Sequence, residues 1–596
     1  MRILLIRRRG VARNASSYFC IIMKTIKEKL AKLLTQKIGI EIKPESFTCP
    51  PNAAMGDLAL PCFELGKSWG KNPAEAAKNA IVMLSLSKHG NAQLKKAEVM
   101  GPYVNFTFKP AFLAKSVLGR DYERGLRLRR SARNDASLRS REKIMIEYSQ
   151  PNTHKEFHIG HLRNACLGAS LVNLHRYLGN NVIAANYIGD TGVHVAKCLW
   201  NLQKFHAGEA LPENKGEYLG KLYAEAVSRL EADEKLLPEV SAVQKKLEKG
   251  DKELTALWQK TKEWSLESFY DIYKLLNNNF DVWFWESEEE KKGKGMIRRM
   301  LKNNLLPEVR VSEGAVIADL SAYGLDVLVL IKSDGNVLYG AKDLPLGIKK
   351  FKKFHVKKSI YVVDKRQELY LKQIFKLLDL LGYADKEKIH VSYDFVTLPE
   401  GAMASRKGNV VTFETFYAEV LQKSVAETKQ RHADWSTEKV NDVAAKISLA
   451  AIKFFMLKYD NGSVIVFDAD KALAFDGDTG PYLLYALARI NSILVKAGAV
   501  GAADQRALKD PTEKSLMIHM LKFDEAVLLA AEENAPARIC SYLIELAQAF
   551  NTFYHHCPVL QADEKTKAAR LALCGKVREL LGKGLNLLNI SIINEM

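Results

Sequence analysis

The sequence has 596 residues, 47% of them hydrophobic and 26% charged, a balance typical of globular proteins with large buried cores. It contains no apolar stretch near the ~18 residues of a membrane-spanning helix. Its eight scattered cysteines include no CxxC pair, which argues against a zinc ribbon or a disulfide framework. The net charge of +19 suits a polyanionic partner without requiring one.

The amino-terminal part is predicted to contain a basic extension, a small domain and a linker. Residues 1–22 are Arg-rich and lack a cleavage site, so we interpret them as a basic extension that results from a misassigned start, with Met23 opening the first helix, rather than as a targeting peptide. Residues 23–118 combine a helical pattern up to Gln36 with an alternating run at 103–108, which predicts an α+β domain. Residues 119–142, rich in arginine, are predicted to be a linker or insertion.

A different pattern begins at Lys143. Apolar runs at 143–148 and 181–190 flank a helical pattern from His161 to Leu178, which Gly179 ends. This strand–helix–strand unit predicts a Rossmann-like, doubly wound parallel sheet, with ligands at the carboxyl ends of its strands.

The remaining runs extend this prediction to the rest of the chain. Apolar runs at 326–331, 359–364 and 389–396 predict further strands of the sheet, and the charged residues 200–300 predict a helical insertion. The sheet domain is expected over 143–432, and an all-α domain over 433–596.

The string PNTHKEFHIGHLRN (151–164) concentrates three histidines where the first strand hands over to its helix. His158 and His161 can both face a phosphate there, because a helix start gathers free N–H groups and positive dipole, and Gly160 leaves room for a flat ring. A metal site needs a third ligand at suitable spacing, and none follows. Simple polar capping is the other interpretation. His154 is expected at the surface.

The wider string IEYSQPNTHKEFHIGHLRN (146–164) resembles the HIGH signature of class I aminoacyl-tRNA synthetases in its arginyl form. Similar segments continue at YIGDTGVHVAK (187–197), DGNVLYGAKDLPL (334–346) and DTGPYLLYALARI (478–490). The resemblance implies an arginine–tRNA ligase that uses ATP and Mg²⁺ and joins L-arginine to tRNA(Arg). It also implies that 23–118 contacts the D-loop side of the tRNA and that 433–596 binds the anticodon.

The same resemblance implies a set of arginine-binding residues. Glu147 and Asp343 would face the guanidinium, with the Tyr339 hydroxyl adding a hydrogen bond, and Asn152 and Gln367 would hold the amino and carboxylate ends. An acid inside the apolar run IMIEY is costly to bury, so a cationic partner for Glu147 is expected on physical grounds as well.

The ATP side follows the family pattern with one departure. His158, Gly160, His161 and Met403 are implied to bind ATP. The second signature, KMSKS, appears only as MASRKG (403–408), which retains positive charge at Arg406 and Lys407. In this family a lysine upstream of HIGH, here Lys155, is implied to replace the missing one. No metal site formed by the protein itself is expected.

In the carboxyl-terminal part, Asn551 and Tyr554 are candidate tRNA contacts, whereas Phe550 and Phe553 are expected in the core. We expect a cytoplasmic monomer without membrane contact. The alternatives are another HIGH-type adenylating enzyme, such as a glutamyl or lysyl synthetase or a nucleotidyltransferase, and a catalytically silent RNA-binding paralogue.

Overall fold

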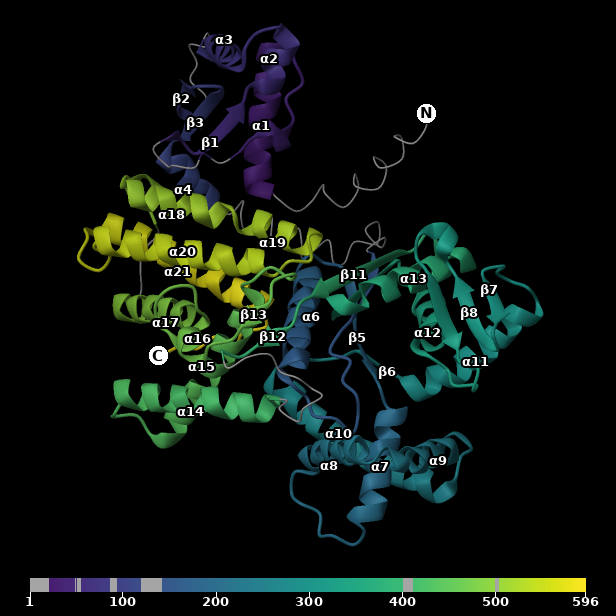
Figure 1. Cartoon of the computed structure of the whole chain (residues 1–596). Coiled ribbons are helices and arrows are strands. Elements are labelled where there is room, and N and C mark those ends of the chain that lie inside the picture. The colour runs from purple at the N-terminus through teal and green to yellow at the C-terminus, as the bar shows by residue number, and fades with distance from the viewer. Residues whose placement is uncertain are drawn as a thin grey trace.

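The computed structural model describes residues 21–48, 50, 55–85, 94–118, 142–399, 411–498 and 503–596 (Figure 1). The predicted extension at 1–22, apart from its last two residues, the Arg-rich stretch up to 141, and Met403, Arg406 and Lys407 lie outside these residues. Within them, no helix has the length and apolar character needed to cross a membrane.

The amino-terminal part is a three-stranded antiparallel sheet covered by helices. Its strands lie in the order β1-β3-β2, and Leu34 and Phe106 are buried in its core. The predicted strand at 103–108 is confirmed as β3. The elements are α1 (Ile21–Ile38), β1 (Leu58–Pro61), α2 (Phe63–Trp69), α3 (Pro73–Ser85), β2 (Leu94–Met100), β3 (Tyr103–Phe108) and α4 (Pro110–Leu118).

The central part is a five-stranded parallel sheet in the order β11-β10-β4-β5-β6, which confirms the predicted doubly wound architecture. The predicted strand–helix–strand unit is β4–α6–β5, and α6 ends before Gly179, whose φ of 87° only glycine adopts easily. The elements are β4 (Lys143–Glu147), α6 (Ile159–Tyr177), β5 (Asn181–Ile188), β6 (Val282–Trp285), β10 (Lys358–Asp364) and β11 (Glu387–Tyr393).

Two strand predictions were wrong. The run at 326–331 contains β9 (Val327–Ile331), which belongs to a separate antiparallel sheet with β7 (Val309–Ser312) and β8 (Ala315–Asp319). Strand β6 lies inside 200–300, a span predicted to be helical. Short apolar runs show that a strand exists but do not specify which sheet receives it. The run at 389–396 continues into β12 (Val396–Thr397), which pairs with β13 (Ile465–Val466).

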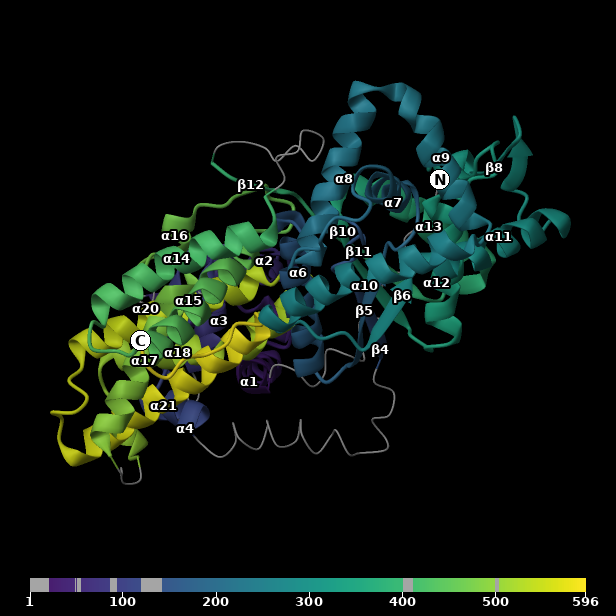
Figure 2. The same cartoon turned by 90° about the horizontal axis from the view of Figure 1, so that it is seen from below.

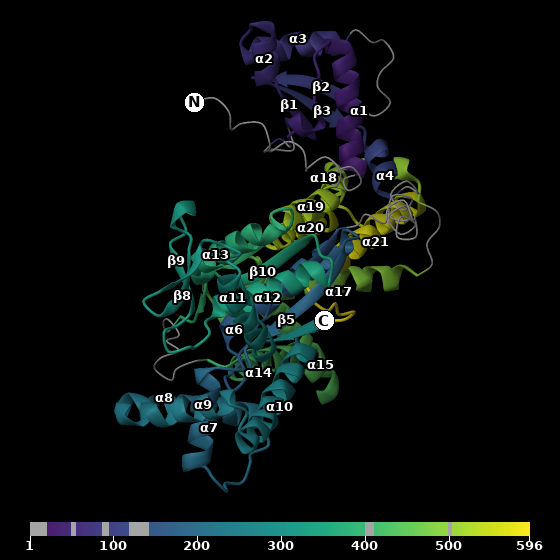
Figure 3. The same ribbon diagram turned by 90° about the vertical axis from the view of Figure 1, so that its right-hand side faces the viewer.

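Helices surround the central sheet on several sides. The insertion helices lie at the opposite end of the molecule from the amino-terminal part (Figures 1 and 3). They are α7 (Val193–Phe205), α8 (Lys215–Ala232), α9 (Leu237–Glu248) and α10 (Lys252–Leu275). Three further helices follow: α11 (Glu286–Lys302), α12 (Tyr339–Lys352) and α13 (Glu368–Leu378).

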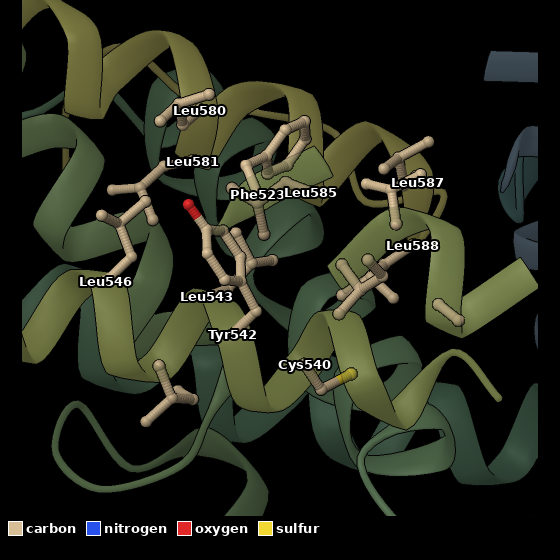
Figure 4. Packing of buried hydrophobic residues seen from close by; sticks show 14 of the residues in the cluster. Phe523, Cys540, Tyr542, Leu543, Leu546, Leu580, Leu581, Leu585, Leu587 and Leu588 are labelled. Carbon is tan, nitrogen blue, oxygen red and sulfur yellow. The ribbon is translucent and has the colours of Figure 1, made fainter. Parts of the chain in front are cut away.

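The carboxyl-terminal part is helical apart from β13. Figure 4 shows leucines of α20 and α21 meeting between the two helices, with Phe523 and Tyr542 filling the space beside them. Phe550 and Phe553 are buried, as predicted. The helices are α14 (Phe413–Arg431), α15 (Thr437–Leu457), α16 (Ala469–Leu473), α17 (Gly480–Ala497), α18 (Pro511–Leu521), α19 (Phe523–Glu532), α20 (Ala537–His556) and α21 (Glu564–Leu587).

Helix α6 lies between the central sheet and the carboxyl-terminal helices (Figures 1 and 2) and connects the two. Ser170 Oγ donates a hydrogen bond to the Leu587 carbonyl at 3.0 Å, and Asn173 Nδ2 donates one to the Asn586 carbonyl at 3.0 Å. The buried Arg163 guanidinium donates to carbonyls of the loops that flank β12 and β13, among them Asp394 at 2.5 Å and Ser463 at 2.8 Å. The helix that carries the HIGH string is therefore shared between the two parts of the molecule.

Candidate active site

The loop after β4 is held in an uncommon backbone conformation. Ser149 and Gln150 both have positive φ, 74° and 51°. Asn164 Oδ1 accepts a hydrogen bond from the Ser149 amide at 2.6 Å, and Asn186 Oδ1 accepts one from the Gln150 amide at 3.1 Å. Two buried side chains thus fix a strained turn at the carboxyl edge of the sheet, which is where such folds bind ligands.

His158 and His161 form a capping box at the start of α6. His158 Nδ1 accepts from the amides of Gly160 (3.1 Å) and His161 (3.4 Å), and His161 Nδ1 accepts from the His158 amide (3.3 Å). The two rings stack with centroids 3.8 Å apart. Because each Nδ1 is an acceptor, the proton of each neutral ring is on Nε2.

Both histidines are neutral at physiological pH. Burial, with Lys155 nearby, lowers the pKa of His158 to about 4. Burial, then the adjacent His158, lowers the pKa of His161 well below its ordinary value. Capping and ligand binding are therefore compatible, because capping uses Nδ1 and leaves two Nε2–H donors at a helix amino terminus.

Lys155 lies against the helical insertion. Its Nζ is 4.8 Å from the centroid of the Tyr223 ring on α8, and burial lowers its pKa. It lines a cavity together with Glu217, Ser268 and Glu414. The insertion therefore contributes to the surroundings of the lysine beside the histidine pair.

The expectation of a surface position for His154 was wrong. His154 is fully buried, its Nδ1 lies 3.0 Å from Thr153 Oγ1, and its Nε2 lies 2.8 Å from Thr261 Oγ1 on α10. Burial, with Lys262 nearby, lowers its pKa to about 3, so the ring is a neutral hydrogen-bonding element of the core. Its polar sequence neighbours suggested an exposed position, whereas its burial depends on the contact with Thr261, more than a hundred positions later.

Glu147, the last residue of β4, has a cationic partner within the protein. The side chain of Lys350 on α12 is 0% exposed, and its Nζ lies 2.8 Å from Glu147 Oε2. Gln150 Nε2 donates to Glu147 Oε1 at 3.1 Å. Lys350 therefore supplies the cation that the burial argument required, and that argument no longer points to substrate.

Asp343 lies near the start of α12. The Tyr370 hydroxyl on α13 donates a hydrogen bond to Asp343 Oδ2 at 2.5 Å. Burial raises the pKa of Asp343 to about 7; Glu147 and Glu286 add to this rise, whereas Tyr370 and Lys350 oppose it. The two carboxylates of the predicted arginine site are thus close enough to influence each other.

The other predicted arginine ligands lie at the edges of this region. Asn152 pairs with Gly189, where an added Cβ would come within 2.0 Å of Asn152 Oδ1. Tyr339, the first residue of α12, is 66% exposed. Gln367 is exposed just ahead of α13, and its neighbour Arg366 contributes to the lowered pKa of His158. Asn152 is therefore fixed in place, whereas Tyr339 and Gln367 are on the rim.

Three residues of the site were missed from the sequence. Lys350 and Tyr370 pair with the two carboxylates, and the Tyr187 hydroxyl is buried without a hydrogen-bond partner among the described residues. Burial and the charge of Asp343 raise the pKa of Tyr187. Only Lys350 could have been found from the sequence. It follows Asp343 by seven positions, which corresponds to two helical turns and places both residues on the same face of a helix.

The candidate tRNA contacts face α17. Asn551 Nδ2 donates to the Tyr482 hydroxyl at 2.8 Å, and the Arg489 guanidinium lies 4.7 Å from the centroid of the Tyr554 ring. Both residues are half-buried at the surface. Elsewhere in the described ranges, no three His, Cys, Asp or Glu side chains gather as a metal site would require.

Three family models match the chain in order. Residues 21–108 match the arginyl tRNA synthetase N terminal domain, 127–468 the catalytic domain of class I (R) tRNA synthetases, and 483–596 the DALR anticodon binding domain.

Whole-chain relatives agree. The chain is 38% identical to the arginine–tRNA ligase of Bdellovibrio bacteriovorus, covering 92% of this chain and 93% of that one, and 32% identical to that of Clostridium perfringens, covering 96% and 100%. The solved arginyl-tRNA synthetase of Thermus thermophilus superposes with a TM-score of 0.77 at 28% identity, covering 97% and 100%.

Proposed function

The chain belongs to the class I arginyl-tRNA synthetases, and on that premise we propose how its residues carry out arginine–tRNA ligation. In the first step a carboxylate oxygen of L-arginine attacks the α-phosphorus of ATP, and pyrophosphate leaves. In the second step a terminal ribose hydroxyl of tRNA(Arg) attacks the carbonyl carbon of the adenylate, loses its proton, and AMP leaves.

Asp343 is the main acceptor for the guanidinium group. It is a half-buried carboxylate with one oxygen bound by the neutral Tyr370 hydroxyl, so its charge is available to a cation. The oxygens of Glu147 and the Tyr339 hydroxyl complete the contacts to the planar guanidinium group. Asn152 and Gln367 bind the α-amino and carboxylate groups of arginine. Lysine, a point charge, would leave acceptors unpaired in such a site, so it is rejected.

The histidine pair stabilises the reacting phosphate. The Nε2–H groups of His158 and His161 donate to the α-phosphate oxygens, on which negative charge develops in the transition state, and ATP lies over Gly160. Lys155, with Arg406 and Lys407 of the second signature and Met403 beside the adenine, completes the ATP site. The stacked, neutral histidine pair at the carboxyl edge of the sheet is the observation that supports this mechanism.

Mg²⁺ enters with ATP rather than in a cage made by the protein. Bound to the nucleotide, the ion neutralises the charge of the pyrophosphate. The described residues include no group of three His, Cys, Asp or Glu side chains that could hold a metal ion. Asn551 and Tyr554 are proposed to contact tRNA. We also propose that the enzyme is a cytoplasmic monomer.

The test is arginine-dependent exchange of pyrophosphate into ATP, measured with tRNA(Arg) present because enzymes of this family typically need it. Exchange with arginine but not with lysine or glutamate is the expected result. A folded protein that binds tRNA but shows no exchange would instead be an RNA-binding paralogue without catalysis.

A further inference from the structure

Lys350 is enclosed together with Glu147 inside the central domain. Glu147 and Tyr361 are direct partners across β4 and β10, and α12 covers them with Lys350. The ammonium lies 2.8 Å from Glu147 Oε2 and 3.8 Å from the centroid of the Tyr361 ring. Burial favours loss of the Lys350 proton, but Glu147 and Tyr361 outweigh it and raise the pKa of Lys350, so the pair is ionic.

Asp343 has no such partner. Its hydrogen bond comes from the neutral Tyr370 hydroxyl, and in the described part of the chain no lysine, arginine or histidine forms an ion pair with it. Glu286 on α11, which contributes to the raised pKa of Asp343, is paired with Lys342 at 2.8 Å. The titratable groups that face the two carboxylates from the surrounding strands and helices are Tyr187, Glu286, Tyr339, Lys350, Tyr361 and Tyr370.

We propose that Lys350 is a positioning residue that neutralises Glu147 within the protein, so that the charge of bound arginine is balanced by Asp343 alone. This inference rests on the proposed function and deepens it. Lys350 forms an ion pair with Oε2 of Glu147, and Gln150 donates a hydrogen bond to Oε1, which leaves acceptor capacity on both oxygens. Glu147 therefore contacts the guanidinium as a neutralised acceptor, while Lys350 fixes the direction of its oxygens.

A cycle of variants separates the two roles of Glu147. The Michaelis constant for arginine is measured in tRNA charging at pH 8 for Glu147→Gln, Lys350→Met and the double variant. Glu147→Gln leaves the buried Lys350 ammonium unpaired beside the substrate cation. The Michaelis constant for arginine should therefore rise about 100-fold or more. In the double variant both charges are gone and the introduced amide still offers an acceptor oxygen, so the constant should rise by no more than about tenfold and stay well below that of Glu147→Gln.

The inference is overturned if the double variant binds arginine as poorly as Glu147→Gln does, since Glu147 would then act through its charge on the substrate. If Glu147→Gln does not fold, the double variant alone decides, provided that its melting temperature and Michaelis constant for ATP match the wild type.

The same two helices offer a matched control. Glu289 on α11 is fully buried, and Lys349 on α12 lies 2.7 Å from it. The cycle of Glu289→Gln and Lys349→Met should change the melting temperature but not the arginine constant. Asp343→Asn tests the proposed function separately: if it charges tRNA as well as the wild type, the arginine site itself is misplaced, whatever the Glu147 cycle shows.

Discussion

At the scale of single residues, one imidazole ring caps a helix with one nitrogen and is proposed to bind phosphate with the other. Nδ1 of His158 caps α6, and its Nε2–H is available to phosphate. Asparagine is also a good helix cap, but its N–H donors are on a shorter side chain and do not reach the position of the imidazole Nε2–H. His158→Asn should therefore lower adenylate formation by about 10²-fold, the usual effect of losing one donor to a charged transition state, with little change in melting temperature. A large fall in melting temperature with proportionate loss of activity would show that the ring serves structure alone.

As the proposed acceptor for the guanidinium, Asp343 should make arginine binding dependent on pH. Its pKa of about 7 is raised from the ordinary 3.8, so the carboxyl becomes protonated as the pH falls below neutrality. A guanidinium pairs with the ionised form, so the Michaelis constant for arginine should rise about tenfold per pH unit below 7 and level off above it. Steady-state charging between pH 5.5 and 8.5 measures this. A flat profile would mean that Asp343 is already ionised throughout or does not contact arginine.

At the scale of elements, close packing of α6 against the end of β4 determines where the HIGH string lies. A Cβ on Gly168 would come within 2.1 Å of the buried Tyr148 ring, which directly follows β4. Gly168→Ala should lower the free energy of unfolding by about 1–3 kcal/mol, as overpacking does, and reduce adenylate formation as α6 shifts. Gly295→Ala on α11 meets open space and should be neutral or stabilising. Thermal denaturation of both variants compares them, and equal melting temperatures would contradict the packing argument.

The same elements show what the sequence could predict. β4, α6 and β5 were predictable because their apolar periods are clear and Gly179 marks a stop. The placement of β9 in a separate sheet and of β6 at the sheet edge was not, because strand partners are chosen by tertiary contacts that leave no local pattern. The ion pair of Lys350 with Glu147 and the burial of His154 depend on contacts between distant segments for the same reason.

At the scale of the molecule, two ion pairs join the amino-terminal part to the carboxyl-terminal helices. Lys514 on α18 lies 2.8 Å from the buried Asp57, and Lys27 on α1 lies 3.3 Å from Glu525 on α19. Lys514→Met leaves Asp57 without its cation and should loosen this attachment. The Michaelis constant for tRNA is then expected to rise about threefold to tenfold, whereas that for arginine stays constant; Lys514→Arg is the control. Equal rises for both substrates would show that the effect reaches the catalytic domain.

The hydrogen bonds from α6 to Asn586 and Leu587 also bear on the order in which the protein is made. Ser170 and Leu587 are 417 positions apart, so a ribosome finishes the HIGH helix long before it makes the backbone that this helix binds. During that interval the nascent catalytic domain carries donors on α6 whose acceptors do not yet exist. Catalytic competence should therefore appear abruptly, once Asn586 and Leu587 have been made, rather than when the catalytic domain emerges.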